Sequence, residues 1–142
     1  MDTTALRSKR EIVVRVHMDS ENRLDFDATV ATFSHPRYEL MGSRRVFDGE
    51  PEVREYFRTS RQEFPDQHNE NVELRHLDDG VLAEFDLFGT HHRNGGVFRV
   101  RMAAMFLFDD DPENPRIVCE RVYFDRQQIV DQVRSTRADQ RL

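Results

Sequence analysis

The amino-acid sequence predicts an α+β fold in which helices pack on one face of a curved antiparallel sheet. Apolar residues recur at helical spacing in the first half of the chain and again near its end, whereas apolar and polar residues alternate through most of the second half. Turn residues join the alternating runs directly, and strands joined by short turns pair antiparallel. The 142 residues suit one domain, with a core over about 9–133 and frayed ends at 1–8 and 135–142.

Two helices are expected at the start of the chain. The first covers residues 9–23, and three apolar residues on one stripe form its expected core face: Ile12, Val13 and Val16. The second covers residues 26–33 and follows Asp25, whose side chain is suited to cap a helix N-terminus. Pro36 ends this second helix, because the residue before a proline avoids the helical region.

A hairpin and a third helix are expected next. The segments 37–40 and 44–47 are short strand candidates, and Gly42 and Ser43 between them suit a two-residue type II′ turn. Residues 50–64 form the clearest helix in the chain, with a proline in the first turn and acidic residues near its N-terminus. Three apolar side chains lie on one stripe of this helix: Val53, Phe57 and Phe64.

The remainder of the chain is expected to be β structure followed by one helix over 126–133. Four strands are joined by turns, over residues 71–77, 81–91, 97–108 and 116–124. In the second of these strands, alternation leaves His91 at the end of an apolar row. The last strand carries a charged residue on each face, Glu120 on one and Arg121 on the other. We therefore expect one side of that strand to meet a polar cavity or a partner chain.

Composition excludes several classes of function. The formal charge of −6, from 21 basic and 27 acidic residues, argues against binding to nucleic acid or to anionic lipid. Cys119 is the single cysteine, so no intrachain disulfide can form. No apolar run is long enough to span a bilayer, and the chain is expected to be cytoplasmic. Glycine loops that bind phosphates and paired residues at zinc spacing are absent from the sequence.

Three local motifs resemble segments of a known family. They are ENRLDFDATVATF at 21–33, FGTH at 88–91 and ERVYFDRQQIV at 120–130. In this order and spacing they resemble the SnoaL-like polyketide cyclases, which are ketosteroid-isomerase-like proteins of the nuclear transport factor 2-like superfamily. The resemblance covers nearly the whole chain. It implies a cone-shaped fold, with helices packed on the concave face of the sheet around a deep apolar pocket.

The resemblance also implies a function. A carboxyl group in the pocket would act as an acid/base on a small apolar carbonyl compound, without metal or cofactor. The alternative is a non-catalytic small-molecule-binding or dimerisation domain, because this superfamily contains such proteins too. Phe88 and Arg99, on exposed strand faces, favour a homodimer formed through the sheet in either case.

By position, the resemblance assigns the acid/base role to Asp125 and an assisting role to His91. Asp125 also fits a second interpretation, in which it caps the last helix together with Gln128 as a capping box. A carboxylate that accepts backbone N–H groups has a lowered pKa and is a poorer base near neutral pH. His91 has a second interpretation as well, as a core or pocket-rim residue without a chemical role.

Four further residues are candidates for substrate binding. Tyr123 and Arg121 share a strand face with Asp125, so the phenol could donate to an oxyanion and the guanidinium could hold an acidic group or neutralise Asp125. Tyr38 and Tyr56 are further candidate pocket donors. Each of these tyrosines also has a plain interpretation as a packing residue.

Overall fold

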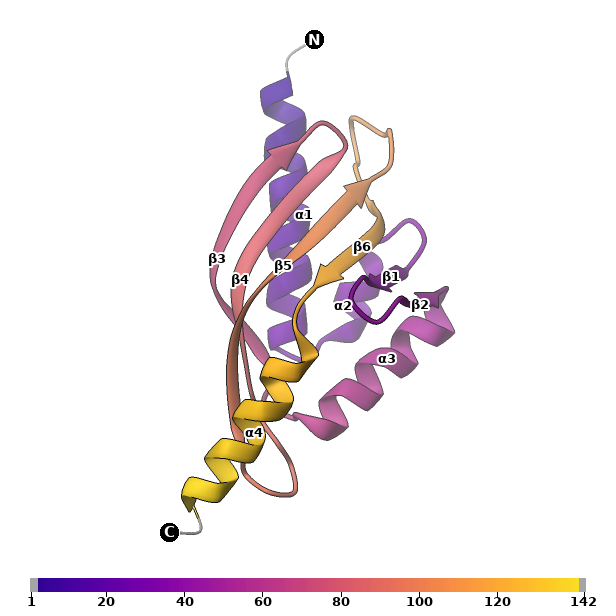
Figure 1. The fold of residues 1–142 in the computed structure, drawn as a ribbon. Helices are drawn as coiled ribbons and strands as arrows, with labels where there is room; N and C mark the ends of the chain where they lie inside the picture. The colour runs from indigo at the N-terminus through magenta and orange to yellow at the C-terminus, as the bar shows by residue number, and fades with distance from the viewer. Residues whose placement is uncertain (1–2, 141–142) are drawn as a thin grey trace.

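The structure, a computed structural model, describes residues 3–140. The first half of this range contains three helices and two short strands, namely α1 (Thr3–Asn22), α2 (Phe26–Ala31), β1 (Arg37–Leu40), β2 (Arg45–Asp48) and α3 (Glu50–Glu63). The second half contains four strands and a helix, namely β3 (His68–Leu77), β4 (Gly80–Thr90), β5 (Val97–Phe108), β6 (Ile117–Tyr123) and α4 (Arg126–Gln140) (Figure 1). The predicted order of elements and the α+β class are confirmed.

The strands form one sheet in the order β2-β1-β6-β5-β4-β3. All neighbouring pairs are antiparallel except β1 and β6, which are parallel and bring together distant parts of the chain. Figure 1 shows the long strands β3, β4 and β5 bending together, with α1 running along the sheet and α4 crossing its lower part. None of the helices within residues 3–140 has the length and apolar character needed to cross a membrane.

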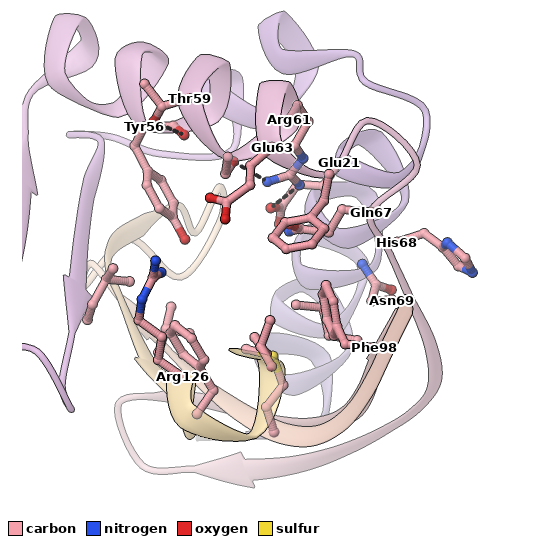
Figure 2. A pocket seen from close by; sticks show the side chains of 18 of the residues that line it. Glu21, Tyr56, Thr59, Arg61, Glu63, Gln67, His68, Asn69, Phe98 and Arg126 are labelled. Carbon is pink, nitrogen blue, oxygen red and sulfur yellow. Dashed lines mark hydrogen bonds and ion pairs between the residues drawn. The ribbon is translucent and has the colours of Figure 1, made fainter. Parts of the chain in front are cut away.

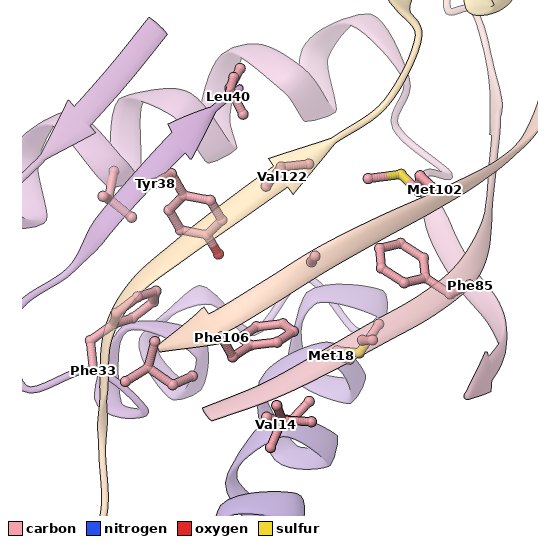
Figure 3. Close-up of a cluster of buried hydrophobic side chains, with 14 of the residues drawn as sticks. Val14, Met18, Phe33, Tyr38, Leu40, Phe85, Met102, Phe106 and Val122 are labelled. Atoms are coloured by element: carbon pink, nitrogen blue, oxygen red, sulfur yellow. The ribbon is translucent and has the colours of Figure 1, made fainter. Parts of the chain in front are cut away.

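The predicted alternation in β4 and β5 is confirmed. The buried side of β4 carries Val81, Ala83 and Phe85. The buried side of β5 carries every second residue, namely Phe98, Val100, Met102, Ala104, Phe106 and Phe108. Most of these side chains form the floor of the core under α1 (Figure 3), whereas Phe98 and Val100 pack in a second cluster with Phe64 and with Val133 of α4. The apolar row therefore defines the concave face of the sheet, on which the helices pack.

The expected core face of α1 is wrong at two of its three positions. Ile12 is 62% exposed and Val16 is 46% exposed. The residues that are buried instead lie on a neighbouring stripe, namely Arg10, Val14, His17, Met18 and Ser20. Three of these are polar and have partners inside the fold, so the pattern of apolar residues alone misplaces the buried face.

The N-terminal boundary of α1 also differs from the expectation. The helix begins at Thr3, so residues 3–8 are helical, whereas the sequence predicted that the helix begins at residue 9; residues 1–2 lie outside the described residues. In the following turns of the helix, Arg10 donates from Nη1 to the Asp78 carbonyl oxygen at 3.0 Å. This hydrogen bond ties the N-terminal half of α1 to Asp78.

Helix α4 likewise continues beyond its expected end. Residues 135–140 are helical, whereas the sequence predicted a helix that ends at residue 133, and residues 141–142 lie outside the described part. Thr136 donates from its hydroxyl to the Val97 carbonyl oxygen at 3.1 Å, which fastens the helix to the start of β5. A contact between distant segments of this kind leaves no periodic signal in the sequence.

The turn between β1 and β2 is longer than the expected two-residue turn at Gly42 and Ser43. Leu40 pairs with Arg45, which leaves a four-residue loop between the strands. Arg44 adopts a positive φ of 61° in this loop. The hairpin itself is confirmed, but the predicted type II′ geometry is wrong, because the sequence signal marked a turn without setting its length.

A bulge in β6 decides which of its side chains face the helices. Leu107 pairs with Cys119 and Phe108 pairs with Ile117, so β6 has one extra residue at this point. A bulge of this kind changes the phase of alternation along a strand. Ile117 and Glu120 are consequently both buried on the concave side, although simple alternation places them on opposite faces.

Candidate active site

A cavity of about 560 Å³ lies between the concave face of the sheet and the helices. Its apolar wall is formed by side chains from the sheet and from α4, including Phe85, Phe98, Met102, Phe106, Val122 and Ile129. Figure 2 shows the polar side chains of α1 and α3 gathered on one side of this space, with Arg126 on the other. This volume is in the range of small-molecule sites in proteins.

A buried polar cluster lies at the inner wall of the cavity and is centred on His17 of α1. The Nε2 atom of His17 is 2.8 Å from Glu120 Oε1 and 2.9 Å from Glu21 Oε1. The Tyr38 hydroxyl lies 3.1 Å from the same nitrogen. His17 is completely buried, whereas Glu21, Tyr38 and Glu120 line the cavity. The cluster therefore joins a buried imidazole to groups that a ligand can reach.

The local structure explains why these side chains meet. His17 and Glu21 are four residues apart, so they lie on the same face of α1. Tyr38 and Glu120 are register partners in the parallel pair of β1 and β6, which places their side chains next to each other on the sheet. Helix α1 then packs over the sheet and brings the two pairs together.

A hydrogen-bond chain holds the His17 ring. The Thr32 hydroxyl donates to the Thr29 carbonyl oxygen at 2.6 Å, so its oxygen is free to accept from His17 Nδ1 at 2.8 Å. Phe33 and Phe106 pack edge-on against the ring. Nδ1 therefore carries a proton, and Nε2 is directed toward the two carboxyl groups. Burial lowers the pKa of His17, but Glu21 and Glu120 more than offset it and raise this pKa to about 9.

The two carboxyl groups have different surroundings. Burial raises the pKa of Glu120 above its usual value, and His17 offsets this only in part. Burial also acts on Glu21, but His17 and Arg61 together bring its pKa below the usual value. Arg61 lies 3.4 Å from Glu21 and does not pair with Glu120. Glu120 is thus the carboxyl group whose proton affinity is shifted toward neutral pH.

The Oε1 atom of Glu120 also lacks a complete set of hydrogen-bond donors. This atom is close to His17 but receives no well-oriented hydrogen bond from any described residue. A buried carboxyl oxygen without a donor is costly in a folded protein. Here the charge of the His17 imidazolium at 2.8 Å offsets part of that cost, while the Glu120 side chain as a whole lines the cavity.

The same cluster contains the ligand types of a cation site. His17, Glu21 and Glu120 each offer one ligand atom, and these atoms lie within 4.8 Å of one another. The charges of the two carboxylates are already balanced by the His17 imidazolium and by Arg61. The positive and negative charges of the cluster are therefore balanced without a further ion, and Glu120 is its carboxyl group with a raised pKa.

The structure places Asp125 away from this cluster. Its side chain is exposed, and Oδ1 accepts a hydrogen bond from the Gln127 backbone N–H at 2.9 Å at the start of α4. Asp125 is not among the side chains that line the cavity. This geometry corresponds to the helix-cap interpretation, and the function proposed below does not use Asp125 as acid or base.

Arg121 and Tyr123 lie on the convex face of the sheet, because the bulge in β6 sets the opposite phase from simple alternation. Arg121 pairs with Glu39 at 2.9 Å, and Tyr123 is 40% exposed. Neither side chain lines the cavity. These two candidate binding residues therefore do not meet the pocket in the structure.

His91, Tyr38 and Tyr56 do line the cavity. His91 lies at the far end from the buried cluster, where its ring packs edge-on against Phe64. Tyr38 belongs to the cluster itself, and burial raises its pKa well above the usual value. Tyr56 has no hydrogen-bond partner for its hydroxyl among the residues described, so this donor is available to a ligand.

Sequence reasoning missed His17, Glu21 and Arg61. The one available signal for the cluster was the charged residue on each face of the last strand, which located Glu120 without giving it a role. His17 and Glu21 carried a weaker signal, their four-residue spacing on one helix face. That spacing is common on solvated helix surfaces and does not by itself indicate a buried site.

Comparison with known proteins connects this arrangement to a family. The SnoaL-like domain matches residues 14–120 of the chain. No curated protein matches the chain. Among solved structures, a putative polyketide cyclase from Xanthomonas campestris pv. campestris is 19% identical, with a TM-score of 0.80 over 90% of this chain and 98% of the other.

Two further structures have the same fold. A ketosteroid-isomerase-like protein from Catenulispora acidiphila, solved with trimethylamine, is 14% identical, with a TM-score of 0.75 over 85% of this chain and 91% of the other. The epoxide hydrolase/cyclase-like enzyme SalBIII, which has a role in pyran ring formation in the polyether salinomycin, is 26% identical. Its TM-score is 0.68 over 87% of this chain and 95% of the other. With the family match over most of its length and a ketosteroid-isomerase-like fold, the chain belongs to the SnoaL-like domain family.

Proposed function

We propose that this protein is a cofactor-independent acid/base enzyme of the SnoaL-like cyclase/isomerase type, which acts on a small apolar carbonyl compound. The observation that carries the proposal is the Glu120 carboxyl group, which is buried, faces the cavity and has a raised pKa. Catalytic bases are most effective when their pKa lies near the working pH. Glu120 is the described carboxyl group that combines these properties.

The proposed reaction begins with proton removal. The Glu120 carboxylate takes a proton from the carbon next to the substrate carbonyl, and the electron pair moves to the carbonyl oxygen to form an enolate. Tyr56 donates a hydrogen bond to this oxygen, because its hydroxyl lines the cavity without another partner. Protonated Glu120 then returns the proton to a second carbon in an isomerisation. In a cyclisation, the enolate carbon attacks a second carbonyl, whose oxygen receives the proton.

His17 acts as a positioning residue in this scheme. It does not line the cavity, but the Nε2 atom of its imidazolium lies 2.8 Å from Glu120 Oε1 and forms an ion pair with this carboxylate. The positive charge opposes the effect of burial and keeps Glu120 able to ionise. Without it, burial would hold the carboxyl group in its neutral form, which cannot accept a proton.

The comparisons support the reaction class and leave the substrate open. SalBIII is a cyclase-like enzyme at 26% identity, and several structures with this fold are named as polyketide cyclases. Ring formation from polyketide carbonyl groups uses the same proton removal next to a carbonyl. The apolar wall of the cavity suits the carbon skeleton of such a compound.

We also propose that the protein forms a homodimer through the convex face of its sheet. Val46 is 46% exposed and Tyr123 is 40% exposed, and both project from that face. The two contact residues predicted from the sequence suit a dimer interface less well, because Phe88 packs against His68 and Arg99 is paired with Asp86. Sedimentation analysis of the protein and of Tyr123→Glu would test this assembly, since an exposed charge weakens a dimer only if the residue is at its interface.

The proposed activity can be tested without knowledge of the natural substrate. 2-Tetralone is an apolar ketone, and exchange of its α-protons in D₂O can be followed by NMR. The protein should accelerate this exchange, and Glu120→Gln should reduce the acceleration by at least about 100-fold, the usual scale of a general base. Asp125→Asn is the matched control and should retain the full rate. Equal rates for Glu120→Gln and the unchanged protein would contradict the proposal.

A further inference from the structure

The charged groups of the cavity are divided between its inner wall and its mouth. At the inner wall, Glu21 and Glu120 are both paired with His17, and Arg61 is paired with Glu21. Three further arginines line the cavity but form no ion pair with any described acidic group, namely Arg45, Arg126 and Arg134, against one unpaired carboxylate, Glu63. Arg45 and Arg126 are the two that lie at the mouth beside Tyr56. The protein as a whole has a charge of −6, and many of its other arginines are paired with carboxylates.

Arg45 is held at the mouth by stacked rings. Its guanidinium lies over Phe47 at 4.9 Å, and Phe47 stacks on Tyr56 at 4.6 Å. Arg45 also acts electrostatically on Tyr56, because with Arg61 it lowers the pKa of the phenol against a larger increase from burial. The series Arg45–Phe47–Tyr56 therefore orders one cationic side chain close to a phenol with a free donor.

Arg126 reaches the same region from the other side. It is the first residue of α4, and its side chain lines the cavity. Figure 2 shows it on the opposite side of the cavity from Thr59 and Glu63, with the Tyr56 hydroxyl directed toward it. Two guanidinium groups and one phenol thus border one part of the mouth. The two planar cationic donors suit a carboxylate, and the phenol remains the donor to the enolate oxygen.

We propose that Arg45 and Arg126 form a subsite for a carboxylate group, so that the substrate is an apolar keto acid rather than a neutral ketone. The inference rests on the proposed function and adds a substrate class to it. The carbon skeleton lies along the apolar wall, with its reacting carbon near Glu120 and its acid group at the mouth.

Binding of three naphthalene derivatives tests the subsite directly. 2-Naphthoate and 2-naphthamide have the same ring and nearly the same shape, but only the first is charged, and 2-naphthyl phosphate carries a different anion. Isothermal titration at pH 7 and low salt should give at least about 10-fold tighter binding for 2-naphthoate than for 2-naphthamide, the scale of one charge-assisted hydrogen-bonding pair. The preference should shrink as salt is added.

Two double variants separate the subsite from general charge effects. Arg45→Gln/Arg126→Gln should remove the preference for 2-naphthoate and leave binding of 2-naphthamide unchanged. Arg44→Gln/Arg116→Gln alters the net charge by the same amount at two exposed positions that do not line the cavity, and it should keep the preference. Equal binding of 2-naphthoate and 2-naphthamide, or loss of the preference in both double variants, would overturn the subsite. Tighter binding of the phosphate than of the carboxylate would overturn the choice of a carboxylate.

The test is independent of the catalytic role of Glu120. Glu120→Gln should keep the preference for 2-naphthoate, because Glu120 lies at the inner wall and not at the mouth. Exchange of 2-tetralone without any carboxylate preference would contradict the subsite alone. A carboxylate preference without exchange would contradict the proposed acid/base function alone.

Discussion

The Nε2 atom of His17 in α1 lies 2.8 Å from Oε1 of Glu120 in β6. This contact crosses the interior between a helix and the sheet and joins a buried cation to a carboxyl group that faces the cavity. It has two consequences. It stabilises the packing of α1 on the sheet, and it sets the proton affinity of the group proposed as the catalytic base. Variants of His17 and Glu120 separate the effect on stability from the effect on proton affinity.

Loss of His17 should destabilise the protein. His17→Gln leaves Glu120 buried without its cation, and removal of one partner from a buried ion pair costs about 3 kcal/mol or more. The double variant His17→Gln/Glu120→Gln should recover much of this loss, because both charges are removed together. Urea denaturation at pH 7 measures the free energy of unfolding of each. A single variant as stable as the unchanged protein would show that the pair does not hold the fold.

Stability should fall as pH rises above neutral. The pKa of His17 is raised from 6.5 to about 9 in the folded protein, so its contribution to stability is complete below pH 6.5 and is lost as the pH rises through 9. The free energy of unfolding should decrease on the order of 2 kcal/mol between pH 6 and pH 8.5. His17→Gln/Glu120→Gln should show a much flatter profile in urea denaturation. A flat profile for the unchanged protein would contradict the assigned direction.

Asp125 should behave as a helix cap. Its side chain accepts a backbone N–H of α4, so Asp125→Ala should lower the free energy of unfolding by about 1 kcal/mol. Asp125→Asn should cost little, because asparagine caps helices nearly as well. Neither change should reduce 2-tetralone exchange at a temperature where the variants are folded. Loss of exchange in Asp125→Asn would restore the catalytic interpretation of Asp125.

Gly96 should be required for the position of α4. A Cβ atom at this residue would lie 2.3 Å from the Val133 carbonyl oxygen and 2.9 Å from Asn94 Oδ1. Gly96→Ala should therefore displace the helix, lower the midpoint of thermal unfolding and weaken ligand binding in the cavity. Gly42→Ala is the control, because its Cβ atom would meet only the Phe124 carbonyl oxygen, at 3.5 Å. Equal midpoints for the two variants would show that α4 adjusts without cost.

Exchange of 2-tetralone should not depend on a metal ion. The two carboxylates of the cluster are neutralised by His17 and Arg61, so proton transfer by Glu120 needs no further charge. Dialysis against EDTA should leave the rate unchanged, and added Zn²⁺ should lower it, because zinc would occupy the Glu120 oxygen that accepts the proton. A rate that falls on dialysis and returns with Zn²⁺ would assign the cluster to a metal instead.

Much of the fold follows from local features of the sequence. Val81, Ala83 and Phe85 alternate with polar residues and are buried as expected, because a strand sends successive side chains to opposite faces. Val53 and Phe57 in α3 and the cap at Asp25 are likewise local patterns with local consequences. Patterns of this kind, in the right order, were sufficient to predict the α+β class.

The site was decided by the tertiary structure. Glu120 faces the cavity because a bulge in β6 changes the phase of the strand, and a bulge depends on the pairing with β5. His17 is buried because Thr32 at the end of α2, Tyr38 in β1 and Glu120 in β6 satisfy its polar atoms. The sequence alone determined which elements form and, in β4, β5 and α3, which faces are buried. Only the packing of distant elements decided which polar residues are enclosed, because burial of a charged group requires partners that the neighbouring residues do not supply.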